Sequence, residues 1–171
     1  MAKKTGWLAL AGFSAAVAGA AWYGSRYSPK DPRTRAWYNR LEKPKLNPPN
    51  EVFPVVWTAL YSLMAISAYR VWRAEPSPER TRALKLWATQ LIANAKWSKL
   101  FFGEHRPDRS LVDVLALEGL ILSYIDNARK VDQPAAAAFV PYAAWVAFAT
   151  YLNEEIARLN PDAEFELPRA S

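Results

Sequence analysis

Aromatic and polar residues between 87 and 101 could form one ligand-binding face. They recur at i, i+3, i+4 and i+7, which places them on one side of a helix. They are Trp87, Gln90, Asn94, Trp97, Ser98 and Phe101. Aromatic rings interrupted by a few hydrogen-bonding groups are typical of a pocket for a flat, partly polar ligand. This face predicts binding by stacking and hydrogen bonding.

Two other segments offer aromatic stripes of the same kind. The first is Trp57, Tyr61 and Met64; the second is Trp145, Phe148 or Ala149, and Leu152. Three further tryptophans, Trp7, Trp22 and Trp72, lie near the ends of apolar stretches. Tryptophan at such ends is usually an interfacial membrane anchor, so we interpret these three as anchors and not as ligand contacts.

Other kinds of chemistry find little support. The chain has no cysteine, which excludes disulfides, thiolate nucleophiles and cysteine metal sites. His105 is the only histidine and falls in a connecting loop, where we expect a surface residue. Neither a pair of catalytic carboxylates nor a phosphate-binding glycine loop is recognisable. No metal site and no required cofactor are therefore predicted. The net charge of +6 suits an anionic partner such as nucleic acid, anionic lipid or an acidic small molecule.

The elements that must position these residues are long apolar helices. Stretches 5–25, 52–69 and 133–153 contain no Asp, Glu, Lys or Arg, and a bilayer span needs roughly 20 mostly apolar residues. Two further segments have spanning length but carry charges. We predict a single all-α membrane domain, a bundle of five transmembrane helices at about 6–25, 52–72, 81–103, 109–130 and 134–158. Five spans place the two termini on opposite faces of the membrane.

The charges inside the third and fourth spans need partners or water, because a charge at the centre of a span costs about 2.5–3.5 kcal/mol. Lys85, Lys96 and Lys99 fall opposite Asn94 on the helix. Antiparallel packing would set Lys99 level with Asp113, and Lys96 near Glu118. We predict at least one ion pair across this hairpin. The alternative is that the lysines extend to the membrane interface.

The remaining segments connect or flank the spans. Loop 26–51 is rich in proline, which predicts an ordered but non-helical loop. Residues 161–171 are expected to form a loose tail. Lys3 and Lys4, followed by an apolar run, also resemble a secretory signal peptide, although the run is longer than usual for one.

Several motifs, in order along residues 37–160, resemble the TspO/MBR family, the bacterial relatives of the mitochondrial translocator protein (peripheral benzodiazepine receptor). The loop carries Trp37-Tyr38, Leu41-Glu42-Lys43-Pro44 and Pro48-Pro49, and the second span Phe53, Val56-Trp57 and Leu60-Tyr61. The third span carries Gln90-Leu91, Asn94, Trp97-Ser98 and Leu100-Phe101-Phe102-Gly103. The last carries Pro141-Tyr142, Ala144-Trp145, Phe148-Ala149 and Leu152-Asn153.

The resemblance implies a five-helix bundle, often dimeric, whose pocket is capped by loop 26–51. In the family this pocket binds tetrapyrroles such as protoporphyrin IX and haem, and synthetic benzodiazepine-type ligands. Matched by motif, the ligand-binding residues are Trp37, Tyr38, Pro48, Trp57, Tyr61, Asn94, Trp97, Ser98, Phe101, Asp113, Trp145, Ala149 and Leu152. Trp87 and Gln90, which share the helix face, are left as residues behind the pocket.

Porphyrin propionates need cations, and the loop supplies them. The candidates are Arg33, Arg35, Arg40 and Lys43, with Lys45 beside them. The alternative for these residues is ordinary contact with lipid headgroups. The family's proposed cholesterol motif is not matched, because Tyr151 is followed by Glu154 and Glu155, so cholesterol recognition is not expected.

Three functions fit these observations. The leading one is an integral membrane protein, in a bacterial cell membrane or a mitochondrial outer membrane, that binds, sequesters or senses porphyrins. The second is light-dependent protoporphyrin degradation, associated in the family with the tryptophans matching Trp57 and Trp145. The third is a transporter of porphyrins or other amphipathic metabolites. Nucleic acid is not expected as a partner.

Overall fold

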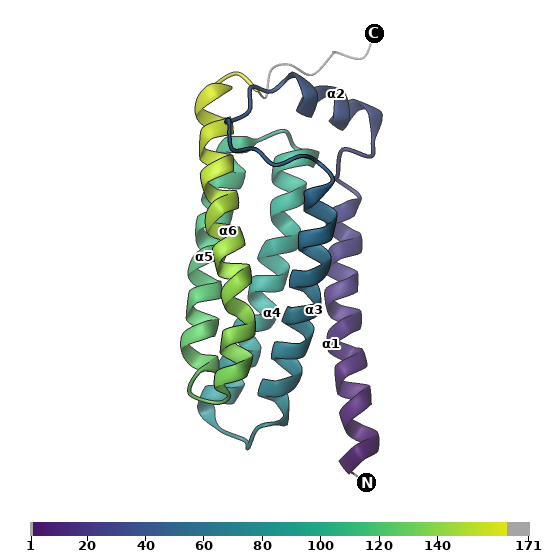
Figure 1. Ribbon diagram of the computed structural model, residues 1–171, viewed down its shortest axis with the longest axis vertical. Coiled ribbons are helices and arrows are strands. Elements are labelled where there is room, and N and C mark those ends of the chain that lie inside the picture. The colour runs from purple at the N-terminus through teal and green to yellow at the C-terminus, as the bar shows by residue number, and fades with distance from the viewer. Residues whose placement is uncertain (1, 164–171) are drawn as a thin grey trace.

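The computed structural model describes residues 2–163, and within this range the regular structure is entirely helical (Figure 1). The elements are α1 (Ala2–Ser25), α2 (Pro32–Arg40), α3 (Val52–Arg73), α4 (Pro78–Ser98), the π-helical turn η1 (Lys99–Gly103), α5 (Pro107–Ala128) and α6 (Gln133–Leu159). Of the predicted tail, residues 164–171 lie outside the described part of the chain.

The long helices run side by side and α2 lies across one end of them (Figure 1). The start of α1 and the end of α6 lie at opposite ends of the bundle, as five alternating spans require. Three of the described helices, α1 from Gly6, α3 and α6, are long and apolar enough to cross a membrane. Helices α4 and α5 lie where the other two spans were predicted, but they carry too many charged residues to count among these apolar helices.

The prediction that loop 26–51 is non-helical is wrong. Residues Pro32–Arg40 form α2, which begins where the Asp31 carboxylate accepts a hydrogen bond from the Thr34 N–H at 2.8 Å. That bond also holds the pKa of Asp31 below its ordinary value. Proline at the first position of a helix loses no hydrogen bond, because the N–H there has no partner within the helix. Pro32 therefore starts the helix instead of breaking it.

One hydrophobic core joins the long helices. Its fully buried members include Met64 and Ala68 on α3, Ile121 and Tyr124 on α5, and Phe139 on α6. Helix α5 packs closely between α4 and α6. Over residues 6–25, by contrast, α1 contributes only Val17 as a buried residue and leaves Trp7 and Trp22 more than 60% exposed. These two tryptophans lie on the outside of the bundle, where membrane anchors would be.

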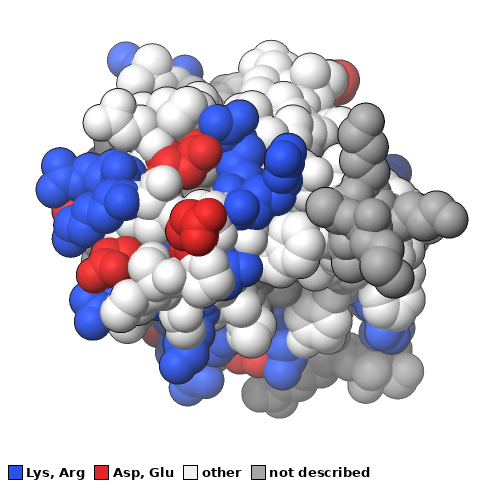
Figure 2. Space-filling view, turned by 90° about the horizontal axis from the view of Figure 1, so that it is seen from below, with Lys and Arg blue, Asp and Glu red and all other residues white. Residues whose placement is uncertain are grey.

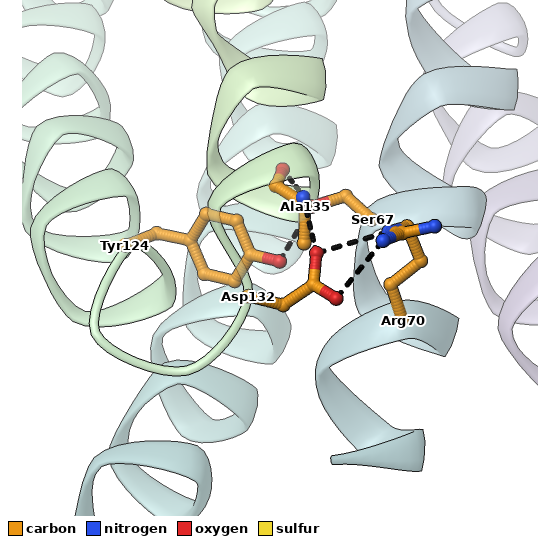
Figure 3. A network of polar contacts seen from close by, with 5 residues as sticks. All are labelled: Ser67, Arg70, Tyr124, Asp132 and Ala135. Atoms are coloured by element: carbon orange, nitrogen blue, oxygen red, sulfur yellow. Dashed lines mark hydrogen bonds and ion pairs between the residues drawn. The ribbon is translucent and has the colours of Figure 1, made fainter.

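A polar network fixes the lower ends of α3, α5 and α6 (Figure 3). The Ser67 hydroxyl lies 2.7 Å from the Tyr124 hydroxyl and donates to the Ala135 carbonyl at 2.7 Å. Beside it, Arg70 makes a two-pronged ion pair with Asp132, at 2.9 and 3.0 Å. Asp132 also caps α6 by accepting from the Ala135 N–H at 2.7 Å. Helix packing here is thus specified by satisfied polar groups as well as by apolar area.

Seen from that end, Lys and Arg side chains spread around the lower face of the bundle with Asp and Glu among them (Figure 2). Asp126 pairs there with both Arg129 and Lys130, at 2.6 and 2.8 Å. These charged side chains lie at or just beyond the end of α5, at one end of the bundle.

The predicted ion pair between the third and fourth spans is confirmed. Lys96 Nζ on α4 lies 2.9 Å from Asp113 Oδ1 on α5. The relative position of the two helices differs from the prediction by about one helical turn. Lys96, and not Lys99, pairs with Asp113, and Lys99 lies 3.5 Å from Glu104. The turn that carries Lys99 is π-helical, and a wider turn advances less along the axis, so Lys99 lies nearer the helix end than α-helical spacing predicts.

Candidate functional site

The centre of the site is a buried amide held between two phenols. Tyr61 on α3 donates its hydroxyl proton to Asn94 Oδ1 at 2.9 Å, and Asn94 Nδ2 donates to the Tyr142 hydroxyl on α6 at 3.0 Å. Asn94 is 5% exposed and Tyr142 is fully buried. The chain of two bonds joins α3, α4 and α6 at one level of the bundle and fixes the orientation of the amide.

Aromatic rings gather around this centre. The Trp57 ring lies 5.3 Å from the Tyr61 ring and 6.1 Å from the Tyr142 ring. On α6, Trp145 lies 5.8 Å from Phe53, which is one turn before Trp57 on α3. Trp57 and Trp145 are both partly exposed, so each keeps ring surface available for a ligand. The two stripes predicted from spacing therefore face the same region, between α3 and α6.

A second set of contacts lies around Trp97. Its indole N–H donates to Asn153 Oδ1 on α6 at 3.0 Å, and its ring stacks on Phe101 at 5.1 Å. Asn153, which is 1% exposed, also accepts from the Ser110 hydroxyl at 2.9 Å and donates to the Pro107 carbonyl at 2.7 Å. One amide thus connects α4, α5 and α6 below the end of the bundle covered by α2.

Helix α2 packs over that end of the bundle through a group of buried hydrophobic residues. We call this group the cap cluster; it consists of Trp37, Tyr38, Leu41, Phe101, Ile156 and Ala163. The Trp37 indole N–H donates to the Ala163 carbonyl at 3.0 Å, and its ring lies 5.7 Å from Phe101. Trp97 packs against both the cap cluster and the main core. The loop predicted to cover the pocket does cover the bundle, through α2.

The cations proposed for propionates differ in their surroundings. Arg33 and Arg40 are exposed on α2. Arg35 donates to the Pro29 and Lys30 carbonyls at 2.9 and 3.4 Å, so it also stabilises the loop before α2. The Lys43 ammonium lies 4.5 Å from the centre of the Tyr38 ring and donates to the Leu41 carbonyl at 3.1 Å. Burial lowers the pKa of Lys43 below its ordinary value.

The other residues expected in the pocket lie in varied places. Pro48 is partly buried in the loop, Ala149 is partly buried on α6, and Leu152 is 6% exposed. Ser98 lies against α1, because a methyl group on Gly24 would come within 3.1 Å of its hydroxyl. Asp113 lies at the α4–α5 contact with Lys96, away from the aromatic centre.

Trp87, left undecided from the sequence, belongs to the core. It is 5% exposed, donates to the Met64 carbonyl at 3.0 Å and packs edge-on against Phe13 at 5.2 Å. Gln90 is fully buried and donates to the Trp87 carbonyl at 3.0 Å. Both share a helix face with Asn94, but Trp87 joins α4 to α3 and α1, and the hydrogen bond of Gln90 lies within α4.

The sequence analysis missed three residues of this region. Tyr142 and Asn153 stood in the quoted motifs, but an isolated tyrosine or asparagine in an apolar run gives no sign of its partners. His105 was expected at the surface; instead it is 7% exposed and its ring lies 4.3 Å from Trp37. Among residues 2–163, no group of three or more His, Asp or Glu side chains is placed to hold a metal ion.

Comparison with known proteins agrees with this architecture. The sequence model of the TspO/MBR family matches residues 12–159. The tryptophan-rich protein TspO of Chlorobaculum tepidum is 38% identical over 81% of this chain and 87% of its own length. The tryptophan-rich sensory protein of Cereibacter sphaeroides is 37% identical over 90% and 92%, respectively. The human translocator protein is 34% identical over 86% and 87%. The chain is therefore a membrane protein of the TspO/MBR family.

Proposed function

We propose that this protein crosses the membrane five times and binds a tetrapyrrole, such as protoporphyrin IX or haem, between α3, α4 and α6 beneath α2. The observation that carries the proposal is the Tyr61–Asn94–Tyr142 chain with the Trp57 ring against both phenols. A buried amide of fixed orientation surrounded by indole rings suits a flat ligand with a few polar atoms.

Five spans are supported by the way charges are paired in α4 and α5. Asp113, whose side chain is 8% exposed, is neutralised by Lys96 on the neighbouring helix. Pairing lowers the cost of placing both groups at membrane depth, so both helices can cross the bilayer beside the three more apolar ones. We place the protein in a bacterial cell membrane, as a homodimer whose role is to sequester or sense porphyrins.

Binding is tested by titrating purified protein in detergent with protoporphyrin IX and following tryptophan fluorescence. We expect saturable quenching at micromolar ligand. Trp57→Phe and Trp145→Phe should each weaken binding by about two- to fivefold, because phenylalanine keeps a ring but loses part of an aromatic contact that is worth about 1 kcal/mol in full. Trp22→Phe, at an exposed position on α1, is the matched control and should leave affinity unchanged. Absence of quenching in the wild-type protein would reject the proposal.

The same samples distinguish binding from photochemistry. After illumination in air, a new tetrapyrrole product that disappears in Trp57→Phe and Trp145→Phe would favour light-dependent degradation. Unchanged porphyrin at full occupancy would leave binding as the function. Uptake of porphyrin into vesicles containing the protein would favour transport.

The role of the loop cations has its own test. Arg33→Gln should weaken protoporphyrin IX binding by about threefold or more, because an exposed charged contact is worth up to about 1 kcal/mol. It should leave a neutral benzodiazepine-type ligand unaffected, since that ligand has no propionate. Arg33 is the better choice than Arg35, which also holds loop carbonyls. Equal losses for both ligands would count against a propionate contact.

A further inference from the structure

His105 occupies an unusual position for a loop histidine. It lies between η1 and α5, beneath α2, with a backbone φ of 53° that non-glycine residues seldom adopt. Its ring is tilted by 47° against the Trp37 ring, with the two ring centres 4.3 Å apart. The fold therefore places the only histidine of the chain against the residue that fastens the cap cluster.

The surroundings of this ring suit only its neutral form. The Nε2 atom is buried and has no hydrogen-bond partner. A neutral imidazole can leave one nitrogen as an unused acceptor at modest cost, whereas imidazolium has N–H groups on both nitrogens and a full charge. Protonation would thus bury an unpaired donor and a charge beside Trp37. This free-energy cost of protonation applies only while α2 is closed over the ring.

The charged groups around the ring do not reverse this preference. Charged groups on α2, on η1, in the first turn of α5, in the last turns of α6 and at the adjoining positions 31, 41–43, 104–106 and 160–162 are Asp31, Arg33, Arg35, Arg40, Glu42, Lys43, Lys99, Glu104, Arg106, Asp108, Arg109, Glu154, Glu155, Arg158 and Asp162. Arg106 and Asp108 are paired at 2.6 Å, and Glu155 is paired with Arg158 at 2.8 Å. Burial lowers the pKa of His105 and exceeds the opposing attraction of Asp31. Attraction between imidazolium and the Trp37 ring would offset only part of the burial cost.

We propose that His105 is a pH-sensitive latch: neutral His105 holds α2 closed through Trp37, and its protonation loosens α2 over the end of the bundle. The latch regulates access to the binding site proposed above, and only this consequence rests on that function. The opening itself is a property of the protein without ligand.

The direction of the effect follows from the two positions of α2. When α2 is open the ring is hydrated and should have the ordinary pKa of an imidazole, about 6.5. When α2 is closed, burial holds the pKa of His105 below that ordinary value. The closed form therefore has its full stability above the open-state pKa and loses it as the pH falls below that value. One proton changes the open-to-closed ratio by at most about tenfold per pH unit.

The absence of cysteine allows a direct test on the full-length protein in detergent. Leu41→Cys places a thiol in the cap cluster, where the side chain is 5% exposed, and Ala36→Cys places one at an exposed position of α2. The ratio of their reaction rates with a methanethiosulfonate reagent cancels the intrinsic pH dependence of thiol reactivity. We expect this ratio to rise about threefold or more between about pH 7.5 and pH 5.5.

His105→Asn is the decisive variant, because asparagine cannot titrate here and tolerates positive φ. In this background the ratio should be independent of pH. A ratio that does not change in the wild-type background, or that changes equally in His105→Asn, overturns the latch. If Leu41→Cys does not fold, amide exchange of residues 32–41, corrected for its intrinsic rate, gives the same test without a thiol. Because no ligand is added, the result is separate from whether porphyrin binds.

Discussion

Asn153→Leu will lower the free energy of unfolding by about 3 kcal/mol, the largest loss that we expect from one substitution of similar size. The change removes the acceptor of the Trp97 indole and of the Ser110 hydroxyl, and the donor to the Pro107 carbonyl. The Trp97 indole N–H is left without a partner, which costs about 1–3 kcal/mol, whereas the Ser110 hydroxyl and the Pro107 carbonyl remain bonded to each other at 3.0 Å. Leucine fills a similar volume, so the loss reflects hydrogen bonding and not a cavity.

The measurement is thermal unfolding in detergent, where a change of this size lowers the midpoint by about 10 °C. Asn50→Leu, the same substitution at an exposed loop position, is the control and should have no measurable effect. A midpoint for Asn153→Leu within about 2 °C of the wild-type value would contradict the role assigned to this amide.

Trp37→Ala will release α2 while leaving the bundle folded. The indole is 1% exposed, and truncating a buried tryptophan costs about 3–5 kcal/mol. The cap cluster bears this loss, because Trp37 does not belong to the main core. Amide exchange of residues 32–40 should accelerate by on the order of 100- to 1,000-fold, since 1.4 kcal/mol corresponds to about tenfold. Porphyrin dissociation should accelerate with it.

Two variants isolate the causes of this effect. Trp37→Phe keeps a ring against Phe101 and His105 but removes the bond to the Ala163 carbonyl, so it should cost about 1 kcal/mol. Trp22→Ala removes an indole that is 64% exposed and should leave exchange in α2 unchanged. Loss of the whole bundle in Trp37→Ala would show that α2 is part of a single folding unit with the core.

The long helices were predictable because apolar composition over a bilayer length has few alternatives. The predicted span 52–72 became Val52–Arg73, and 134–158 became Gln133–Leu159. Helix α2 was missed because prolines were interpreted only as helix breakers. The signal for it was present, since Asp31 followed by Pro32 is a helix start.

The face of α4 that carries the proposed binding residues could be predicted from helical spacing. Which residues of that face lie at the proposed site, and which lie in the core, could not. Helical spacing put Asn94, Trp97 and Phe101 on one face, but it put Trp87 and Gln90 on that face as well and could not separate the two sets. Neighbouring helices decide between them: Trp87 meets a backbone carbonyl of α3, whereas Asn94 meets two phenols. Ser98 shows the same limit, because its contact with Gly24 depends on how α1 packs.

His105 could not have been assigned from sequence at all. Its burial depends on α2 returning over the η1–α5 connection and on Ala163 closing the cluster from beyond α6. Residues 31–41, 101–105 and 156–163 are far apart along the chain, and no local pattern links them. A loop histidine therefore becomes a core residue only through tertiary structure.

The Lys96–Asp113 pair also affects how the protein enters the membrane during synthesis. Released from the translocon alone, α4 would carry an unpaired ammonium into lipid, and α5 an unpaired carboxylate, at about 2.5–3.5 kcal/mol each near the centre. Held together, the two neutralise each other. If α4 and α5 cross the membrane as proposed above, we expect the α4–α5 hairpin to leave the translocon as one unit after α5 has been made, whereas α1, with no charge between residues 5 and 25, can partition by itself.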